Sequence, residues 1–138
     1  MKPRTVGDCQ YVSLPVIRSP QGKITPVHGG VEVPFEIART FYVYDIPGGE
    51  TRGSHAHLTC EEFIVCLLGS FDVIVDDGVD RDVFHLDRSY RGLYLPPMIW
   101  ISYSNLAPGS ICLVLASRPY EETDYIRDYD TFVERSRQ

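Results

Sequence analysis

The chain has 138 residues, of which 43% are hydrophobic and 23% charged, the size and composition of one globular domain spanning residues 1–138. Its formal net charge of −6 at pH 7, without a basic run, argues against binding to nucleic acid or to an acidic membrane surface. No apolar run is long enough to cross a bilayer, and the first residues contain no apolar signal core, so we expect a cytoplasmic protein. The four cysteines are then expected to be reduced thiols of the core: Cys9, Cys60, Cys66 and Cys112.

Most of the chain is predicted to form short strands separated by turns. Phe71, Val73 and Val75 occupy alternate positions, which is the period of a strand with one buried face. Asp77-Gly78 follows as a turn. Further apolar or β-branched runs cover residues 37–45, 62–68, 83–86, 93–95 and 111–116. Many short strands at this spacing are typical of an all-β sandwich or barrel.

The C-terminal segment, residues 121–136, has a different periodicity. Its apolar side chains recur at helical spacing: Tyr125, Ile126, Tyr129, Phe132 and Val133. Acidic residues lie near its start, where a helix dipole favours negative charge. We therefore expect one short helix packed on the outside of the β structure, with the aromatic stripe as its packing surface.

The segment GETRGSHAHLTCEEF, residues 49–63, carries the clearest candidate site. Residues two apart in a strand face the same side, so His55 and His57 should point together, with Ala56 opposite. Inside a barrel, both rings would project into the lumen. Two exposed histidines on a surface strand are the alternative interpretation of the same spacing.

The residues around the histidines extend this pattern. The spacing resembles the first motif of the cupin superfamily, small β-barrels of two packed sheets in which two histidines and a glutamate often bind a metal: Gly49, His55, His57, Glu62 and Gly69. Gly92, Pro96 and Asn105 fit the second cupin motif, which supplies a third histidine. Trp100 and Ile101 occupy the place of that histidine and cannot ligate a metal. At most three protein ligands remain, a number that suits only an open catalytic metal site.

A closer resemblance runs from about residue 18 to residue 132. The segments that carry it are ARTFYVYD (38–45), TRGSHAH (51–57), EEFIVCLLGS (61–70), VDDG (75–78), GLYLPPMIW (92–100) and LASRPYEETDYIRDYDTF (115–132). Together they resemble the sugar-nucleotide 3,4-ketoisomerases of deoxysugar biosynthesis. The resemblance implies a cupin, or jelly-roll, β-barrel that converts dTDP-4-keto-6-deoxyglucose to a dTDP-3-keto-6-deoxyhexose. It also implies a homodimer with an exchanged N-terminal strand and no required metal or other cofactor.

The implied reaction is a tautomerisation, and it needs groups that accept and donate protons near neutral pH. Histidine suits that task, so we expect His55 and His57 to be the proton-transfer pair. His55 is assigned to carbon, and His57 to the oxygens or to a water. Tyr42, on a neighbouring strand, is a candidate for holding the developing enolate, or else a core tyrosine.

The substrate carries a diphosphate, which suits the planar fork of arginine. Arg39 and Arg52 lie in the resembling segments and are predicted to contact the diphosphate or the sugar. Tyr44 and Trp100 are candidates for an apolar wall or for stacking on thymine, with core packing as the alternative. Lys23 is a candidate for reaching the site across the dimer. Arg127 is expected to be structural.

Two departures from the resembling family leave alternatives open. Glu62 stands where relatives can carry glutamine, so a metal-dependent cupin enzyme that uses His55, His57 and Glu62 is one alternative. Ile101 stands where relatives can carry a polar or basic residue, which leaves open whether the C4 hydroxyl of the product is axial or equatorial. A non-catalytic sugar-nucleotide-binding module and a C3 or C5 epimerase of the same sugar are further alternatives.

Overall fold

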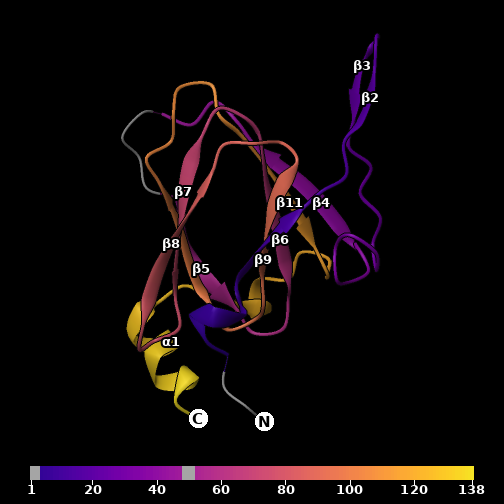
Figure 1. Cartoon of the computed structure of the whole chain (residues 1–138). Helices are drawn as coiled ribbons and strands as arrows, with labels where there is room; N and C mark the ends of the chain where they lie inside the picture. The colour runs from indigo at the N-terminus through magenta and orange to yellow at the C-terminus, as the bar shows by residue number, and fades with distance from the viewer. Residues whose placement is uncertain (1–3, 48–51) are drawn as a thin grey trace.

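The computed structural model describes residues 4–47 and 52–138, except for the side chain of Arg52. The fold consists of two five-stranded antiparallel sheets that pack face to face, with one short C-terminal helix (Figure 1). One sheet has the order β1 (Gln10–Ser13), β9 (Arg91–Leu95), β6 (Glu62–Leu68), β11 (Ile111–Ala116) and β4 (Arg39–Val43). The other has the order β12 (Tyr125–Ile126), β5 (Arg52–His57), β10 (Trp100–Ser104), β7 (Phe71–Asp76) and β8 (Arg81–Leu86). The predicted cupin-like all-β class is confirmed.

Strand alternation determines which side chains fill the space between the sheets. The predicted strands over residues 62–68, 71–76 and 111–116 are confirmed with the same bounds, whereas the strand predicted over 37–45 is limited to Arg39–Val43. In β7 the alternate residues Phe71, Val73 and Val75 are fully buried. They pack with side chains of β6, β9, β10 and β11 into one core cluster between the two sheets.

Two glycines of the cupin-like motifs are required by the local geometry. Gly69, between β6 and β7, has a φ of +86°, and a Cβ there would lie 2.3 Å from the Ser110 hydroxyl oxygen. A Cβ on Gly92 in β9 would lie 2.0 Å from the ring of Phe63 on β6. Any side chain at Gly92 would therefore displace an aromatic ring of the core.

The C-terminal segment differs from its prediction. The helix α1 (Tyr129–Ser136) begins eight residues after Glu121, with Asp128 as its N-cap. The residues before it form a 3₁₀ turn, η2 (Glu122–Asp124), and the strand β12. The prediction of a continuous helix is wrong because Tyr125 and Ile126 pair with His57 and Ala56 of β5. The helix itself packs outside the barrel as expected, with Phe132 fully buried beside Ala56.

A hairpin formed by β2 (Ile17–Ser19) and β3 (Gly22–Ile24) projects away from the barrel (Figure 1). All six of its residues are exposed, including Ile17 at 55% and Ile24 at 64%. An isolated two-stranded hairpin is at best marginally stable in water. The short 3₁₀ turn η1 (Val6–Asp8) precedes β1. Among the described residues, no helix is long and apolar enough to span a membrane.

Candidate active site

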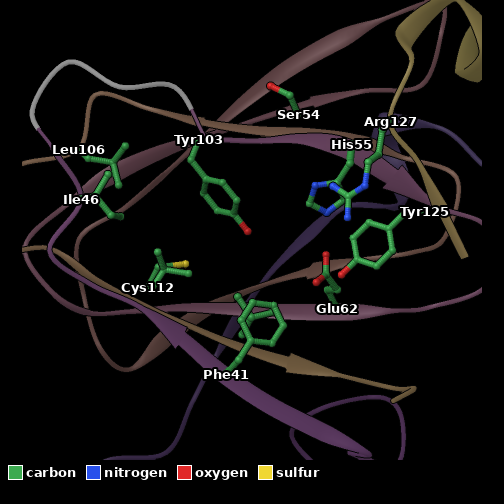
Figure 2. A pocket seen from close by; sticks show the side chains of 12 residues that line it. Phe41, Ile46, Ser54, His55, Glu62, Tyr103, Leu106, Cys112, Tyr125 and Arg127 are labelled. Atoms are coloured by element: carbon green, nitrogen blue, oxygen red, sulfur yellow. The ribbon is translucent and has the colours of Figure 1, made fainter. Parts of the chain in front are cut away.

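The candidate site is a cavity of about 470 Å³ between the two sheets. This volume lies within the range of small-molecule sites. Its walls are mostly apolar, with a few polar groups at the end where β5, β6 and β12 meet (Figure 2). The lining residues are Phe41, Val43, Ile46, Ser54, His55, Glu62, Tyr103, Leu106, Cys112, Val114, Tyr125 and Arg127.

His55 lies on the cavity wall. It comes from β5, opposite Ile101 of β10. Burial lowers the pKa of its imidazole from 6.5 to about 4, and the nearby His57 and Arg127 act in the same direction, whereas Glu62 opposes them. His55 is therefore a neutral imidazole at pH 7, and a neutral imidazole can accept a proton from a bound molecule.

His57 lies behind the wall. It faces the same side of β5 as His55, as predicted, with the ring centroids 4.9 Å apart. The His57 residue is only 3% exposed and does not line the cavity. Its Nε2 lies 3.4 Å from Glu62 Oε1, and its Nδ1 lies 3.5 Å from Asp124 Oδ2. Neither contact meets the geometry of a hydrogen bond, so among the described residues both ring nitrogens are buried beside carboxylates without a hydrogen-bond partner.

Asp124 fixes the turn between β5 and β6. Its Oδ1 accepts hydrogen bonds from the Thr59 amide at 2.9 Å and the Thr59 hydroxyl at 2.6 Å. Its Oδ2 accepts from the Cys60 amide at 3.1 Å and also faces His57. Asp124 is a residue that the sequence analysis missed as part of the site. The sequence pattern placed Asp124 at the start of a helix, and that pattern gives no indication of its contact with Thr59, 65 residues earlier in the histidine segment.

The donor atoms at this end of the cavity are close enough to surround a metal ion. One atom each from His55, His57 and Glu62 lie within 4.8 Å of one another. Ile101, at the place of the third cupin histidine, is 2% exposed and belongs to the apolar core cluster. The set fits a three-ligand site with open positions and not a closed four-ligand one. A metal bound there would supply Lewis-acid chemistry at the same end of the cavity.

Two further cavity residues come from the segment predicted to be helical. Tyr125 and Arg127 line the cavity, with the Arg127 guanidinium 4.3 Å from the Tyr125 ring centroid. Arg127 also forms a two-pronged ion pair with Glu122, at 2.6 and 2.9 Å. The expectation that Arg127 is purely structural is therefore too narrow. Tyr125 and Arg127 are two residues apart, which puts both side chains on one face of an extended segment. This spacing was the signal in the sequence that could have identified them as cavity residues.

Tyr42 and Tyr44 lie on the wrong side of their segment for the predicted roles. In β4 it is Phe41 and Val43 that face the cavity. Tyr42 is 62% exposed on the opposite face, and its ring lies 5.7 Å from that of Tyr44, which is 58% exposed. Neither tyrosine is among the residues that line the cavity of its own chain. Tyr103 and Tyr125 are the tyrosines of its wall.

The remaining predicted contacts have different positions. Arg39 is not among the residues that line the cavity, but its guanidinium lies 5.1 Å from the centroid of Phe41, which does line it. The buried Nε of Arg39 has no hydrogen-bond partner among the described residues. Trp100 packs on Tyr129 and Phe132 of the C-terminal helix, as the packing alternative expects, and it is not among the residues that line the cavity. Lys23 is exposed on β3 of the projecting hairpin. The side chain of Arg52 lies outside the described part of the chain.

Sequence comparison identifies relatives across nearly the whole chain. Residues 7–137 match the protein family described as "FdtA: WxcM-like, C-terminal". The TDP-4-oxo-6-deoxy-alpha-D-glucose-3,4-oxoisomerase of Aneurinibacillus thermoaerophilus is 39% identical over 123 residues, which are 89% of this chain and 88% of the relative. The resemblance drawn from the sequence motifs is therefore confirmed.

Solved structures agree with this assignment. QdtA, a sugar 3,4-ketoisomerase from Thermoanaerobacterium thermosaccharolyticum solved in complex with TDP, superposes with a TM-score of 0.93 at 30% identity, covering 96% of this chain and 97% of QdtA. The WlaRB TDP-quinovose 3,4-ketoisomerase of Campylobacter jejuni superposes with a TM-score of 0.88 at 36% identity, covering 92% and 98%. By sequence and fold, the chain belongs to the FdtA family of WxcM-like, C-terminal proteins.

Proposed function

We propose that the protein is a sugar-nucleotide 3,4-ketoisomerase that converts dTDP-4-keto-6-deoxyglucose to a dTDP-3-keto-6-deoxyhexose. The relatives described above are named for 3,4-isomerisation of TDP-linked keto-sugars, which supports this reaction class. The observation that carries the proposal is His55, a neutral imidazole on the wall of a cavity large enough for the sugar. The reaction is internal to the substrate, so it consumes no redox cofactor.

The chemistry requires two proton movements at carbon and two at oxygen. His55 takes the C3 proton, and the C3–H electron pair forms a C3–C4 double bond as the C4 carbonyl oxygen gains a proton from a carrier, His57 or a water, that later takes the C3 hydroxyl proton. The resulting enediol collapses in the other direction. The C3 hydroxyl loses its proton to leave a carbonyl, and C4 gains a proton from His55. No atoms or electrons are gained or lost overall, and general acid–base catalysis of this kind contributes about 10²–10⁴-fold in rate.

Arg39 is proposed to hold the diphosphate at the open end of the cavity. Its buried Nε lacks a partner among the described residues, and an unpaired guanidinium N–H is stabilised by a phosphate oxygen. Arg52 remains a proposed second contact. Tyr42, Tyr44 and Trp100 are not included, because their side chains face away from the cavity.

A homodimer with an exchanged N-terminal segment is part of the proposal. Ile17 and Ile24 of the hairpin β2–β3 are exposed in the described part of the single chain, and a second copy would cover them. Such an exchange would also let Lys23 approach the partner's cavity. A cytoplasmic location is proposed as well, since the four cysteines are free and buried, which is typical of a reducing compartment.

The test is product analysis with purified protein and dTDP-4-keto-6-deoxyglucose. A ketoisomerase gives a 3-keto sugar, whose proton couplings at C4 report an axial or equatorial hydroxyl. An epimerase keeps the 4-keto group and inverts C3 or C5, and a binding module binds without conversion. Either of those results would overturn the proposal.

A metal-dependent enzyme is the second candidate, because the donor atoms of His55, His57 and Glu62 converge. It predicts stoichiometric metal after gentle purification and loss of activity with a chelator. Full activity after chelation would dismiss it.

A further inference from the structure

Two of the buried cysteines lie directly opposite each other on neighbouring strands. Cys66 of β6 pairs with Cys112 of β11 in the antiparallel register of their sheet. Both residues are buried in the core cluster between the two sheets, so both side chains leave their strands on the same, inner face. Cys9 and Cys60, in contrast, lie outside the strands. The fold therefore places the thiols of Cys66 and Cys112 next to each other on one face of the sheet.

The spacing of such a pair suits a disulfide bond. Residues directly opposite in an antiparallel ladder have Cα atoms about 4.5 or 5.5 Å apart. The Cα atoms of disulfides lie about 4.4–6.8 Å apart. Because the two Cβ atoms also point to the same face, rotations about the Cα–Cβ bonds of Cys66 and Cys112 would bring the two sulfurs together. A shift of register between Ile111 and Cys112 interrupts the ladder there and gives β11 room to adjust.

The two thiols differ in their access to small molecules. Cys112 lines the cavity, and Figure 2 shows its side chain on the wall of that space. Cys66 does not line the cavity, and its thiol donates a hydrogen bond to the Leu68 carbonyl oxygen at 3.4 Å. Burial raises the pKa of the Cys66 thiol above its usual value, which keeps this thiol protonated and slow to react. A small oxidant in the cavity therefore meets Cys112 first.

We propose that Cys66 and Cys112 form a redox-modification site, in which a peroxide that enters the cavity converts the two thiols to a reversible disulfide bond. The Cys112 sulfur attacks one oxygen of hydrogen peroxide, the O–O bond breaks, and the other oxygen leaves as water with the thiol proton. The Cys66 sulfur then attacks the sulfur of the resulting sulfenic acid, the S–O bond breaks, and a second water leaves with the proton of Cys66. Two thiols are oxidised, and one peroxide is reduced to two waters.

The position of Cys66 gives this reaction a protective role. The cysteines are reduced in the structure, and disulfides in a cytoplasmic environment are usually transient or redox-sensing. A sulfenic acid without a neighbouring thiol is oxidised further to a sulfinic acid, which thiol reductants do not reverse. Cys66, directly opposite Cys112, intercepts the sulfenic acid as a disulfide, which thiol reductants do reverse. The pair thus protects the cavity wall from irreversible damage at Cys112.

The disulfide bond is expected to slow turnover while it persists. It ties together two strands of the cavity wall, since β11 supplies Cys112 and Val114 to that wall and β6 supplies Glu62. A displacement of about 1 Å at an active site costs up to about 10²-fold in rate. We therefore expect the oxidised protein to isomerise dTDP-4-keto-6-deoxyglucose about 10–100-fold more slowly than the reduced protein. This effect on turnover rests on the proposed function, whereas formation of the bond does not.

The first experiment treats the reduced protein with hydrogen peroxide and measures its intact mass. We expect a mass about 2 Da lower, the loss of two hydrogens, and a disulfide-linked pair of peptides that contain Cys66 and Cys112 after non-reducing digestion. Dithiothreitol should restore both the mass and the rate of isomerisation, the latter to within about twofold. Cys9→Ala is the matched control and should form the same bond, because Cys9 is buried in the same core cluster but lies outside the strands.

The second experiment removes one thiol at a time. In Cys66→Ala, peroxide should convert Cys112 to the sulfinic acid, a gain of about 32 Da that dithiothreitol does not reverse. In Cys112→Ala, the same treatment should leave Cys66 unmodified, because Cys66 does not line the cavity. Each variant is compared with its own untreated sample, so a change in its basal activity does not affect the result.

Three outcomes would overturn the inference. They are a wild-type mass that peroxide leaves unchanged, a disulfide that maps to a different pair of cysteines, and oxidation of Cys66→Ala that dithiothreitol fully reverses. A bond that forms without slowing isomerisation would contradict the expected effect on turnover. If the reduced wild-type protein does not isomerise the sugar, the proposed function fails, while the mass and the peptide map still decide whether the disulfide forms.

Discussion

The inner and outer faces of the sheet that contains β4 and β6 depart from the usual pattern of burial in opposite ways. Inside, polar groups are buried: Glu62 of β6 is 3% exposed, and His57 of the facing sheet is also 3% exposed. Outside, large apolar groups are exposed, with Tyr42 at 62%, Tyr44 at 58% and Leu68 at 60%. Buried polar groups are costly unless they are partnered, and contiguous exposed apolar groups mark interaction surfaces.

Each face of this sheet is therefore incomplete in its own way. A polar small molecule would satisfy the buried polar groups of the inner side, and in the proposed homodimer a second chain would cover the outer side with its hairpin. Strand alternation builds the inner and the outer surface from the same strands, because neighbours such as Phe41 and Tyr42 must face opposite sides. Substitutions on the two sides should therefore have separable effects on turnover and on assembly.

The largest effect is expected inside, at His55. His55→Asn keeps a polar side chain in a polar part of the cavity, so folding should be retained, but it removes the base. We expect kcat/KM to fall about 10²–10⁴-fold while TDP still binds, measured by product formation and calorimetry. Near-full activity of this variant would remove His55 from the reaction.

Outside, the hairpin should affect assembly and leave folding intact. Ile24→Asp removes the burial of one isoleucine from the proposed dimer, about 1.5–3 kcal/mol, or roughly 10–100-fold in its dissociation constant. Analytical ultracentrifugation over a concentration series measures this. Val79→Asp is the control, since Val79 is 84% exposed and lies in the loop between β7 and β8 on the other sheet. An equal effect of both variants, or none of Ile24→Asp, would contradict the assigned surface.

Arg39 should affect ligand affinity more than rate. Arg39→Ala removes a charge-assisted contact to the diphosphate, so we expect TDP to bind about tenfold more weakly in calorimetry. Arg88→Ala is the control, because Arg88 pairs with Asp87 at 3.5 Å and does not line the cavity. Unchanged TDP affinity in Arg39→Ala would dismiss the phosphate role.

The pH dependence should be small around neutrality. Because burial holds the pKa of His55 near 4, its neutral form persists as pH falls from 8 to 6, and protonation removes the base only below about pH 5. We expect kcat/KM to vary by about twofold or less between pH 6 and 8 and to fall with increasing acidity below pH 5. An acidic limb centred near 6.5 would show that His55 is not desolvated in solution.

The smallest effect is expected for Tyr42→Phe. The hydroxyl of Tyr42 points away from the cavity side of β4, so its removal should leave kcat/KM within about twofold. A loss of tenfold or more would show that the outer face of one chain takes part in a site, as it would if a partner's cavity adjoined it.

The parts of the fold that the sequence predicted well depend on local patterns. Alternation located β6, β7 and β11, and the H-x-H spacing placed both histidine rings on one side of β5. Ile101, at the place of the third cupin histidine, is buried, and one donor atom each from His55, His57 and Glu62 lie within 4.8 Å of one another. The extent of the single domain, residues 1–138, remains a prediction.

The failures concern the pairing of distant segments. Whether Phe41 or Tyr42 faces the cavity depends on the register between β4 and β11, which no local pattern specifies. Tyr125 matched a helical period, yet pairing with His57 draws it into a strand. The same pairing buries His57 and brings Asp124 to it, so the contact between Asp124 and His57 could not be read from the histidine segment alone.

The most direct test of the central claim is a proton NMR time course of the chelator-treated wild-type protein with dTDP-4-keto-6-deoxyglucose in heavy water. We expect the C3 proton signal to disappear and a 3-keto product to accumulate, because a neutral His55 can remove that proton without a metal. An intact C3 proton beside an unchanged 4-keto sugar would contradict it.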